Sequence, residues 1–345
     1  MDERFEAVNT PADVRELLLF SGLNCEDPER LKKRILSGFE VDVVKQNPKR
    51  KVYRLRCPDG SALYLKLFAG QTPIQAIFRF YARQEYQAAR TLEKAGLPMI
   101  RYLAWGRLRR GGFCLSEGIP EAVSSRQYFF ETLVNRPDLR DSFLNQLSEV
   151  TGQLRHLRVR HPDFHLGNIL FSPVTQQLSL ADPWGVHQVP LMLKKYRLEL
   201  CLPWVELSGS VPHAQLISGL EDAGLSGSAS EAESLLQEAM ARHDSQIRLH
   251  RNKLDARIMS GKSKFATEVE LPEGRCAFRH TEWYAPPERL EISSGWQAVR
   301  FENEAESRRI WLDSFLQIPP LKNPPLARLT ALDGSTVLFY AHRIS

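Results

Sequence analysis

The sequence is poor in cysteine, and the arrangement of its cysteines excludes two kinds of protein. Its five cysteines form no C-x-x-C pair and lie far apart, at Cys25, Cys57, Cys114, Cys201 and Cys276. Neither a zinc site nor a disulfide framework is indicated, so we expect a protein of a reducing compartment.

Long apolar segments are also missing. No uninterrupted apolar run approaches the roughly 18 residues that a membrane span needs. Residues Met1–Glu6 lack the basic-then-apolar pattern of a signal peptide. We therefore expect a cytoplasmic protein that is at most peripheral to a membrane.

Size and charge are compatible with a globular enzyme. A chain of 345 residues with 43% hydrophobic content suffices for two lobes or two domains with a real core. Lysine and arginine number 46 against 41 acidic residues, a formal charge of +5. This mild excess would attract anionic ligands such as nucleotides, phosphosugars or an acidic membrane surface without selecting one of them. Nucleic acid is not an expected partner.

The first third of the chain is dominated by strand patterns around one helix. Thr72 and Pro73 fit the first positions of that helix, and Gly96 fits the residue just after its end. Turn formers separate the first three strands, which predicts an antiparallel meander. The expected strands are residues 39–45, 51–57, 61–68, 102–109 and 113–117.

The rest of the chain is predicted to be helical and then rich in strands. Leu139–Arg158 has apolar residues at helical spacing, whereas residues 218–230 are rich in Gly and Ser and predict a loop. Ser230 and Glu233 form a capping-box pattern that opens a long helix reaching Ile258. Strand patterns return after residue 259.

Polar residues with the chemistry of a metal site flank a predicted hairpin. The segment His161-Pro-Asp163-Phe-His165-Leu-Gly-Asn168 precedes its first strand, and Asp182 follows its second. Antiparallel closure brings Asn168 and Asp182 to the same end of the hairpin. Two hard oxygen ligands then converge, as Mg²⁺ prefers.

A lysine and a glutamate upstream are predicted to pair. Lys66 lies in the strand Tyr64-Leu-Lys66-Leu-Phe68, and Glu85 lies on the apolar stripe of the following helix. A carboxylate in that position is costly unless it is paired. We therefore predict a Lys66–Glu85 ion pair. The alternative is that both side chains are solvated, as most strand lysines and helical glutamates are.

These residues, in this order and approximate spacing, resemble the protein-kinase-like superfamily over residues 39 to about 220. The resemblance implies a kinase that uses ATP and Mg²⁺. It also implies an α+β, two-lobed fold with a small antiparallel β-rich N-lobe and a mainly helical C-lobe. The implied roles are Lys66 on the ATP phosphates, Glu85 holding Lys66, Asn168 and Asp182 as metal ligands, and Asp163 as the catalytic base or orienter.

The implied division of the chain has four parts. Residues 1–38 form a helical lead-in, 39–117 the N-lobe, 118–258 the C-lobe, and 259–345 a β-rich C-terminal extension.

Within the superfamily, the segment from His161 to Leu170 is similar to small-molecule kinases, since protein kinases carry Arg where this chain has Pro162. The compact size, the basic turn and the basic late helix most resemble the bacterial lipopolysaccharide core heptose or Kdo kinases. This implies a glycolipid sugar hydroxyl as acceptor and peripheral contact with the inner face of the inner membrane. A kinase of the aminoglycoside or choline type and a non-catalytic pseudokinase remain alternatives.

Two features depart from the superfamily pattern. No G-x-G-x-x-G loop joins the first two strands; the turn Gln46–Lys51 is basic instead. We predict that Lys49 and Arg50 bind phosphate by charge, the alternative being a solvated hairpin tip. Ala181-Asp182-Pro183-Trp184-Gly185 is a variant of the D-F-G element, which places Trp184 near the cleft.

Other interpretations stay open for several residues. The H-x-D-x-H string of His161, Asp163 and His165 also fits a one-metal hydrolase. We expect His161 to support the loop, and His165 either to touch metal or substrate or to brace the loop. The basic late helix, from Arg242 to Arg257, is either a solvated face or a surface for anionic lipid or sugar phosphates.

Overall fold

The computed structural model describes residues 14–20, 23–47, 50–69, 81–108, 111–263, 265–279, 296–316 and 324–341. It contains helices and antiparallel sheets, as the sequence predicts. The chain divides into two compact units, Met1–Met240 and Ala241–Ser345. Helix α11 (Ala229–Met259) belongs to both.

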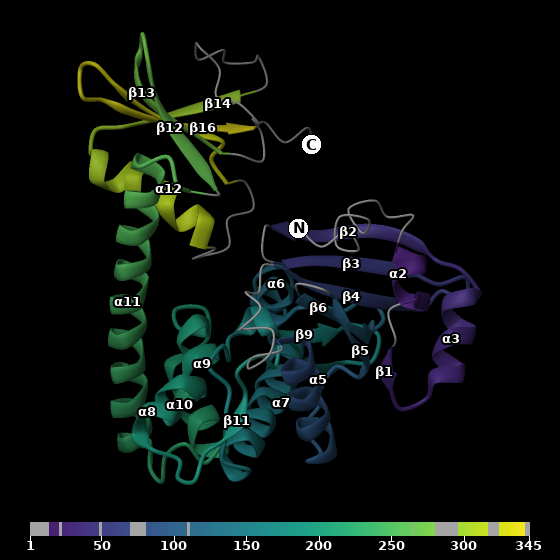
Figure 1. Ribbon diagram of the computed structural model, residues 1–345. Helices are drawn as coiled ribbons and strands as arrows, with labels where there is room; N and C mark the ends of the chain where they lie inside the picture. Colours follow the sequence, from purple (N-terminus) through teal and green to yellow (C-terminus); the bar gives the residue numbers. More distant parts are fainter. Residues whose placement is uncertain are drawn as a thin grey trace. The chain divides into compact units, whose positions relative to one another are not determined.

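The first unit begins with a six-stranded antiparallel sheet of order β1-β5-β6-β4-β3-β2 (Figure 1). The predicted meander is β2-β3-β4, and its second turn is tied by Asp59, whose Oδ1 accepts the Ser61 N–H at 2.9 Å. Gly60 takes φ +80° there, a conformation that glycine adopts without strain. The strands are β1 (Asn24–Cys25), β2 (Glu40–Asn47), β3 (Arg50–Arg56), β4 (Ala62–Ala69), β5 (Tyr102–Leu108) and β6 (Gly111–Glu117).

The two faces of this sheet pack against different helices. Side chains alternate along β4, so Leu63, Leu65 and Leu67 are buried in one core with helices α2 (Val14–Phe20) and α3 (Pro28–Leu36). Helix α5 (Tyr81–Lys94) packs on β5 and β6 from the other side. Lys66 therefore projects towards the face that carries α5. The predicted helix start at Thr72-Pro73 lies outside the described residues.

The second half of this unit is mainly helical around one apolar core. Helix α7 buries the predicted stripe, including Phe143, Leu147 and Leu154. Two small sheets lie beside the helices, with orders β10-β9-β7 and β11-β8. The helices are α6 (Ser125–Glu131), α7 (Pro137–His156), α8 (Lys194–Leu200), α9 (Leu202–Leu207) and α10 (His213–Asp222); the strands are β7 (Val123–Ser124), β8 (Val159–Arg160), β9 (Ile169–Ser172), β10 (Gln177–Leu180) and β11 (His187–Gln188).

The loop predicted over residues 218–230 is wrong at both ends. Helix α10 continues to Asp222 because Leu216, Ile217 and Leu220 bury one of its faces. Gly219 fits inside this helix because the Trp204 ring packs onto it, only 2.4 Å from where a Cβ would stand. Close packing, rather than a break in the helix, accounts for this glycine.

The capping box of α11 also lies earlier than predicted. Ser228 Oγ accepts the Glu231 N–H at 3.3 Å, and Glu231 Oε2 accepts the Gly227 N–H at 2.9 Å. The predicted pair, Ser230 and Glu233, lies within the helix, where Glu233 forms an ion pair with His213. Both pairs have the same three-residue spacing, so the sequence pattern alone could not choose between them.

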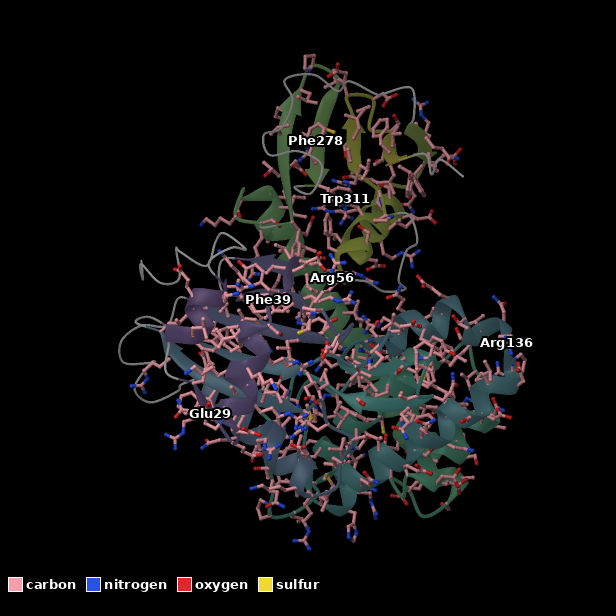
Figure 2. The ribbon with its side chains drawn as sticks, turned by 90° about the vertical axis from the view of Figure 1, so that its right-hand side faces the viewer. Glu29, Phe39, Arg56, Arg136, Phe278 and Trp311 are labelled. Carbon is pink, nitrogen blue, oxygen red and sulfur yellow. The ribbon has the colours of Figure 1, made fainter. Side chains whose placement is uncertain are left out.

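The second unit contains a five-stranded antiparallel sheet of order β12-β13-β15-β16-β14. Adjacent residues of β13 face opposite sides: Ala277 packs with Trp311 of helix α12, whereas Phe278 packs with Phe339 (Figure 2 labels Trp311 and Phe278). The elements are β12 (Ala266–Leu271), β13 (Gly274–Arg279), β14 (Trp296–Phe301), α12 (Glu304–Leu316), β15 (Ala327–Ala331) and β16 (Thr336–Ala341).

Candidate active site

Lys66 and Glu85 meet on the face of the sheet that carries α5. Lys66 Nζ lies 2.7 and 2.8 Å from the two carboxylate oxygens of Glu85. Glu85 is fully buried, and the Tyr102 hydroxyl of β5 donates to its Oε1 at 2.7 Å. Two donors thus offset the cost of burying this carboxylate. Sequence reasoning missed Tyr102; its only signal is its place on the strand beside α5.

Asp182 joins this pair from the mainly helical half of the unit. Its Oδ1 lies 2.7 Å from Lys66 Nζ, and its Oδ2 lies 3.1 Å from Arg50 Nη1. Burial acts to raise the pKa of Asp182, but the two cations outweigh burial and hold that pKa below its usual range. Its backbone is left-handed, with φ +48°, which is uncommon for a residue other than glycine and typical of constrained sites.

The predicted hairpin brings Asn168 to the same end as Asp182. Strands β9 and β10 are antiparallel, and Ile169 pairs with Leu180 at the open end of the hairpin. One residue further on, the Ala181 N–H donates to the Asn168 carbonyl at 2.8 Å. The Asn168 side-chain amide donates to the Asp163 carbonyl at 3.0 Å. The amide oxygen of Asn168 is then the atom left for a ligand. Together with the Asp182 carboxylate it supplies the hard oxygen donors that Mg²⁺ prefers, so these residues fit that metal.

Asp163 is exposed in the loop that precedes the hairpin. Partial desolvation, reinforced by the negative charge of Asp182, raises the pKa of its carboxyl, and Arg50 opposes that rise. Asp163 and Asp182 are therefore two carboxylates whose surroundings shift their pKa values in opposite directions. Such a pair is a recognised mark of an acid–base site.

The two histidines of the loop are not arranged as metal ligands. His161 is 1% exposed, and burial lowers its pKa to about 4, so the ring is neutral at physiological pH. His165 Nδ1 accepts the Gly167 N–H at 3.0 Å, which braces the loop. Across the residues that the structure describes, no three His, Cys, Asp or Glu side chains gather to hold a metal. The one-metal hydrolase interpretation therefore lacks its ligand set there.

A largely buried ion pair, Arg126–Glu206, contacts the backbone of this loop. Glu206 of α9 accepts the Leu166 N–H at 2.8 Å and pairs with Arg126 of α6. Both side chains are largely buried, at 11% and 16% exposure. Nothing in the local sequence around Glu206 or Arg126 indicates this contact, because the two residues lie far from the loop along the chain.

Lys66, Arg50 and Asp182 line a cleft with a cavity volume of about 220 Å³. We call it the charged cleft. The rest of its lining contains Lys45, Glu117 and apolar side chains such as Val52 and Leu170. Lys51, the next residue after Arg50, is buried, and burial lowers its pKa.

Of the two remaining residues predicted near the cleft, Trp184 lies in the part of the chain that the structure describes and Lys49 does not. Trp184 is 41% exposed, and its ring packs edge-on against Tyr81 of α5, with centroids 5.9 Å apart. No helix in the described segments is long and apolar enough to cross a membrane.

Comparison with known proteins finds likeness in structure but none in sequence family. No family model matches the sequence, and no curated protein matches it. A solved structure described as "WaaP in complex with acyl carrier protein" is similar at a TM-score of 0.49 and 21% identity, over 65% of this chain and 98% of that one. A likeness at this level says nothing of function, so the case for a function depends on the geometry of the site.

Proposed function

We propose that the protein is an ATP- and Mg²⁺-dependent kinase of the two-lobed, protein-kinase-like kind. The observation that carries the proposal is Lys66, held between Glu85 and Asp182 at 2.7 Å from each, in the lining of a cleft. Asp163 and Asn168 lie in the loop that precedes Asp182. This is the set of groups that positions ATP phosphates, metal and an acceptor hydroxyl in phosphoryl transfer.

The acceptor that we propose is a sugar hydroxyl of lipopolysaccharide core, on heptose or Kdo. Support comes from the resemblance of the segment His161–Leu170 to kinases of that family. The same proposal implies a cytoplasmic protein with peripheral contact at the inner face of the inner membrane, because a glycolipid acceptor is anchored there.

Nucleotide binding is assigned to the cations of the charged cleft. Lys66 would bind the ATP phosphates, with Glu85 and the Tyr102 hydroxyl fixing its position. Arg50 would take the part that backbone amides play in a glycine-rich loop. In that role, Arg50 would exchange its single contact with Asp182 Oδ2 for phosphate oxygens. A guanidinium can bind two oxygens of a phosphate at once.

Asp182 and Asn168 would hold Mg²⁺ through a carboxylate and an amide oxygen. When bound, Mg²⁺ would neutralise charge on the ATP phosphates. Asp163 would orient the acceptor hydroxyl and accept its proton. A raised pKa makes its carboxylate a better proton acceptor than an unperturbed aspartate.

A direct test is a screen of acceptors with purified protein and labelled ATP. We expect Mg²⁺-dependent transfer of label to dephosphorylated lipopolysaccharide core and none to aminoglycosides or choline. Transfer to a soluble alcohol instead would support kinase activity but contradict the proposed acceptor.

A second candidate function is a pseudokinase that binds a partner without catalysis. The observation that favours it is the Arg50–Asp182 ion pair, which occupies a carboxylate oxygen that a metal would need. Thermal stabilisation by ATP without any turnover, on any acceptor of the screen, would favour this candidate.

A further inference from the structure

A second recess in the first unit has a cavity volume of about 480 Å³, compared with about 220 Å³ for the charged cleft. It lies between α5 and the segment after Asp182. We call it the neutral groove. Its floor is apolar, formed by Ala88, Leu92, Val159 and Val186, and its polar side chains are Gln84, Gln87, Thr91, His187 and Gln188.

Apart from the His187 imidazole, no ionisable side chain occurs among the described residues that line the neutral groove. The charged cleft, by contrast, has Lys45, Arg50, Lys66 and Asp182 in its lining. A groove without cations is a poor site for phosphate or carboxylate, because a buried or half-buried anion needs a cation or several N–H donors.

The side chains of the groove offer a ligand both donors and acceptors. Gln188 donates one amide N–H to the Leu157 carbonyl at 3.5 Å, which leaves its second N–H and its Oε1. The Thr91 hydroxyl donates to the Gln87 carbonyl at 2.8 Å, which leaves its lone pairs. His187 Nδ1 donates to the Gly185 carbonyl at 2.9 Å, so Nε2 is the ring nitrogen left for a ligand. Sugar hydroxyls both donate and accept hydrogen bonds, so they suit a lining that offers both kinds of partner.

Aromatic rings stand at one end of the groove. Trp184 precedes the lining residue Gly185, and Tyr81 lies one helical turn before the lining residue Gln84. Their rings meet edge to face at 77°, and Trp184 is 41% exposed. A half-exposed indole beside polar side chains is suited to a ligand with apolar ring faces and hydroxyl edges.

The groove adjoins the loop that carries Asp163. A Cβ at Gly185 would stand 3.2 Å from Pro162, the residue before Asp163. His187 pairs with Arg160 across β11 and β8. The wall of the groove is therefore in direct contact with the segment that leads into the proposed catalytic aspartate.

We propose that the neutral groove binds a neutral, hydroxyl-rich saccharide, namely the part of the acceptor that is not phosphorylated. This inference rests on the proposed kinase function for its biological setting. The binding itself depends only on the groove, so the two can fail separately.

The test is calorimetric titration of the purified full chain with core oligosaccharide from which lipid and phosphate groups have been removed. We expect binding that barely changes with salt concentration, because no charged group takes part. In the double variant Gln87→Ala/Gln188→Ala the affinity should fall about tenfold or more, from the loss of two hydrogen-bonding side chains. The matched control is Gln237→Ala on α11, an exposed glutamine outside the groove, which should bind as the wild type does.

Three outcomes would overturn the proposal. They are no binding by the wild type, equal affinity in the double variant, or binding only of a phosphorylated oligosaccharide with steep salt dependence. A thermal shift with ATP and Mg²⁺ on the same samples separates the two proposals. Saccharide binding without that shift would contradict the proposed kinase function and support the proposed role of the groove. The shift without saccharide binding would contradict the role of the groove alone.

Discussion

The charged cleft and the neutral groove belong to the same unit but present opposite chemistry. In the cleft, Lys66 and Arg50 approach Asp182 at 2.7 and 3.1 Å, so two cations are paired there with one carboxylate. In the groove, amide, hydroxyl and imidazole groups stand over an apolar floor. Under the proposed kinase function, ATP phosphates would bind through charge in the cleft, whereas sugar hydroxyls would bind through neutral hydrogen bonds in the groove.

Removing the central cation should produce the largest contrast between the two recesses. Lys66→Ala deletes the group between Glu85 and Asp182, and loss of one well-placed electrostatic donor costs about 10² to 10³ in kcat. It also leaves Glu85 buried with one partner, and breaking a buried ion pair costs about 3 to 5 kcal/mol of stability. Kinetics and urea unfolding measure the two effects. Saccharide affinity should not change; a loss of it would erase the distinction between the recesses.

The pH dependence of stability should report the burial of His161 in the loop that carries Asp163. Its folded pKa of about 4 lies below the unfolded value of 6.5, so the unfolded chain binds more protons between these pH values. The free energy of unfolding should therefore fall as pH falls from about 6.5 to about 4, by on the order of 3 kcal/mol in total. His161→Asn should lack this component, and an unchanged slope in that variant would contradict the assignment.

A smaller effect is expected from the hydroxyl that supports the charged cleft. Tyr102→Phe removes the 2.7 Å hydrogen bond to the fully buried Glu85 carboxylate and little else. Hydrogen bonds to charged groups are worth about 1.5 to 3 kcal/mol, and thermal unfolding should show a loss of that size. Tyr128→Phe, at a buried tyrosine of α6, is the control for removing a hydroxyl from the protein interior. Equal losses of stability in the two variants would contradict a specific contribution of the Tyr102–Glu85 hydrogen bond.

The smallest predicted effect has the opposite sign. The pKa of Asp163 is raised in the folded state, so its carboxylate is less favourable there than in the unfolded chain. Asp163→Asn should therefore slightly raise the melting temperature at neutral pH, and the gain should vanish as pH falls and the wild-type carboxyl becomes protonated. A lower melting temperature at neutral pH would show that Asp163 is a stabilising group.

The sequence predicted the parts of the cleft that follow from local pattern. Lys66 and Glu85 lie where strand alternation and the helical stripe place them, and Asn168 meets Asp182 because a short hairpin must close on itself. These contacts need only the period of an element and the direction of a turn.

The contacts that the sequence did not reveal depend on three-dimensional packing. Tyr102, Glu206 and Arg126 are ordinary residues of strand or helix until the sheet and α9 are placed. The packing of Trp204 against Gly219 could likewise not be read from the sequence, which predicted a loop where the structure has helix. The neutral groove could not be predicted either, because its residues come from α5 and from a segment remote from it in the chain.

One measurement tests the central claim most directly: transfer of label from ATP to dephosphorylated lipopolysaccharide core by the wild type, by Asp163→Asn and by Gln237→Ala. The account predicts Mg²⁺-dependent transfer by the wild type and the control, and a loss of roughly 10² to 10⁴ in rate for Asp163→Asn, the usual worth of a positioned base. The melting temperature of Asp163→Asn should be at least that of the wild type. Normal transfer by the folded Asp163→Asn protein would contradict the account.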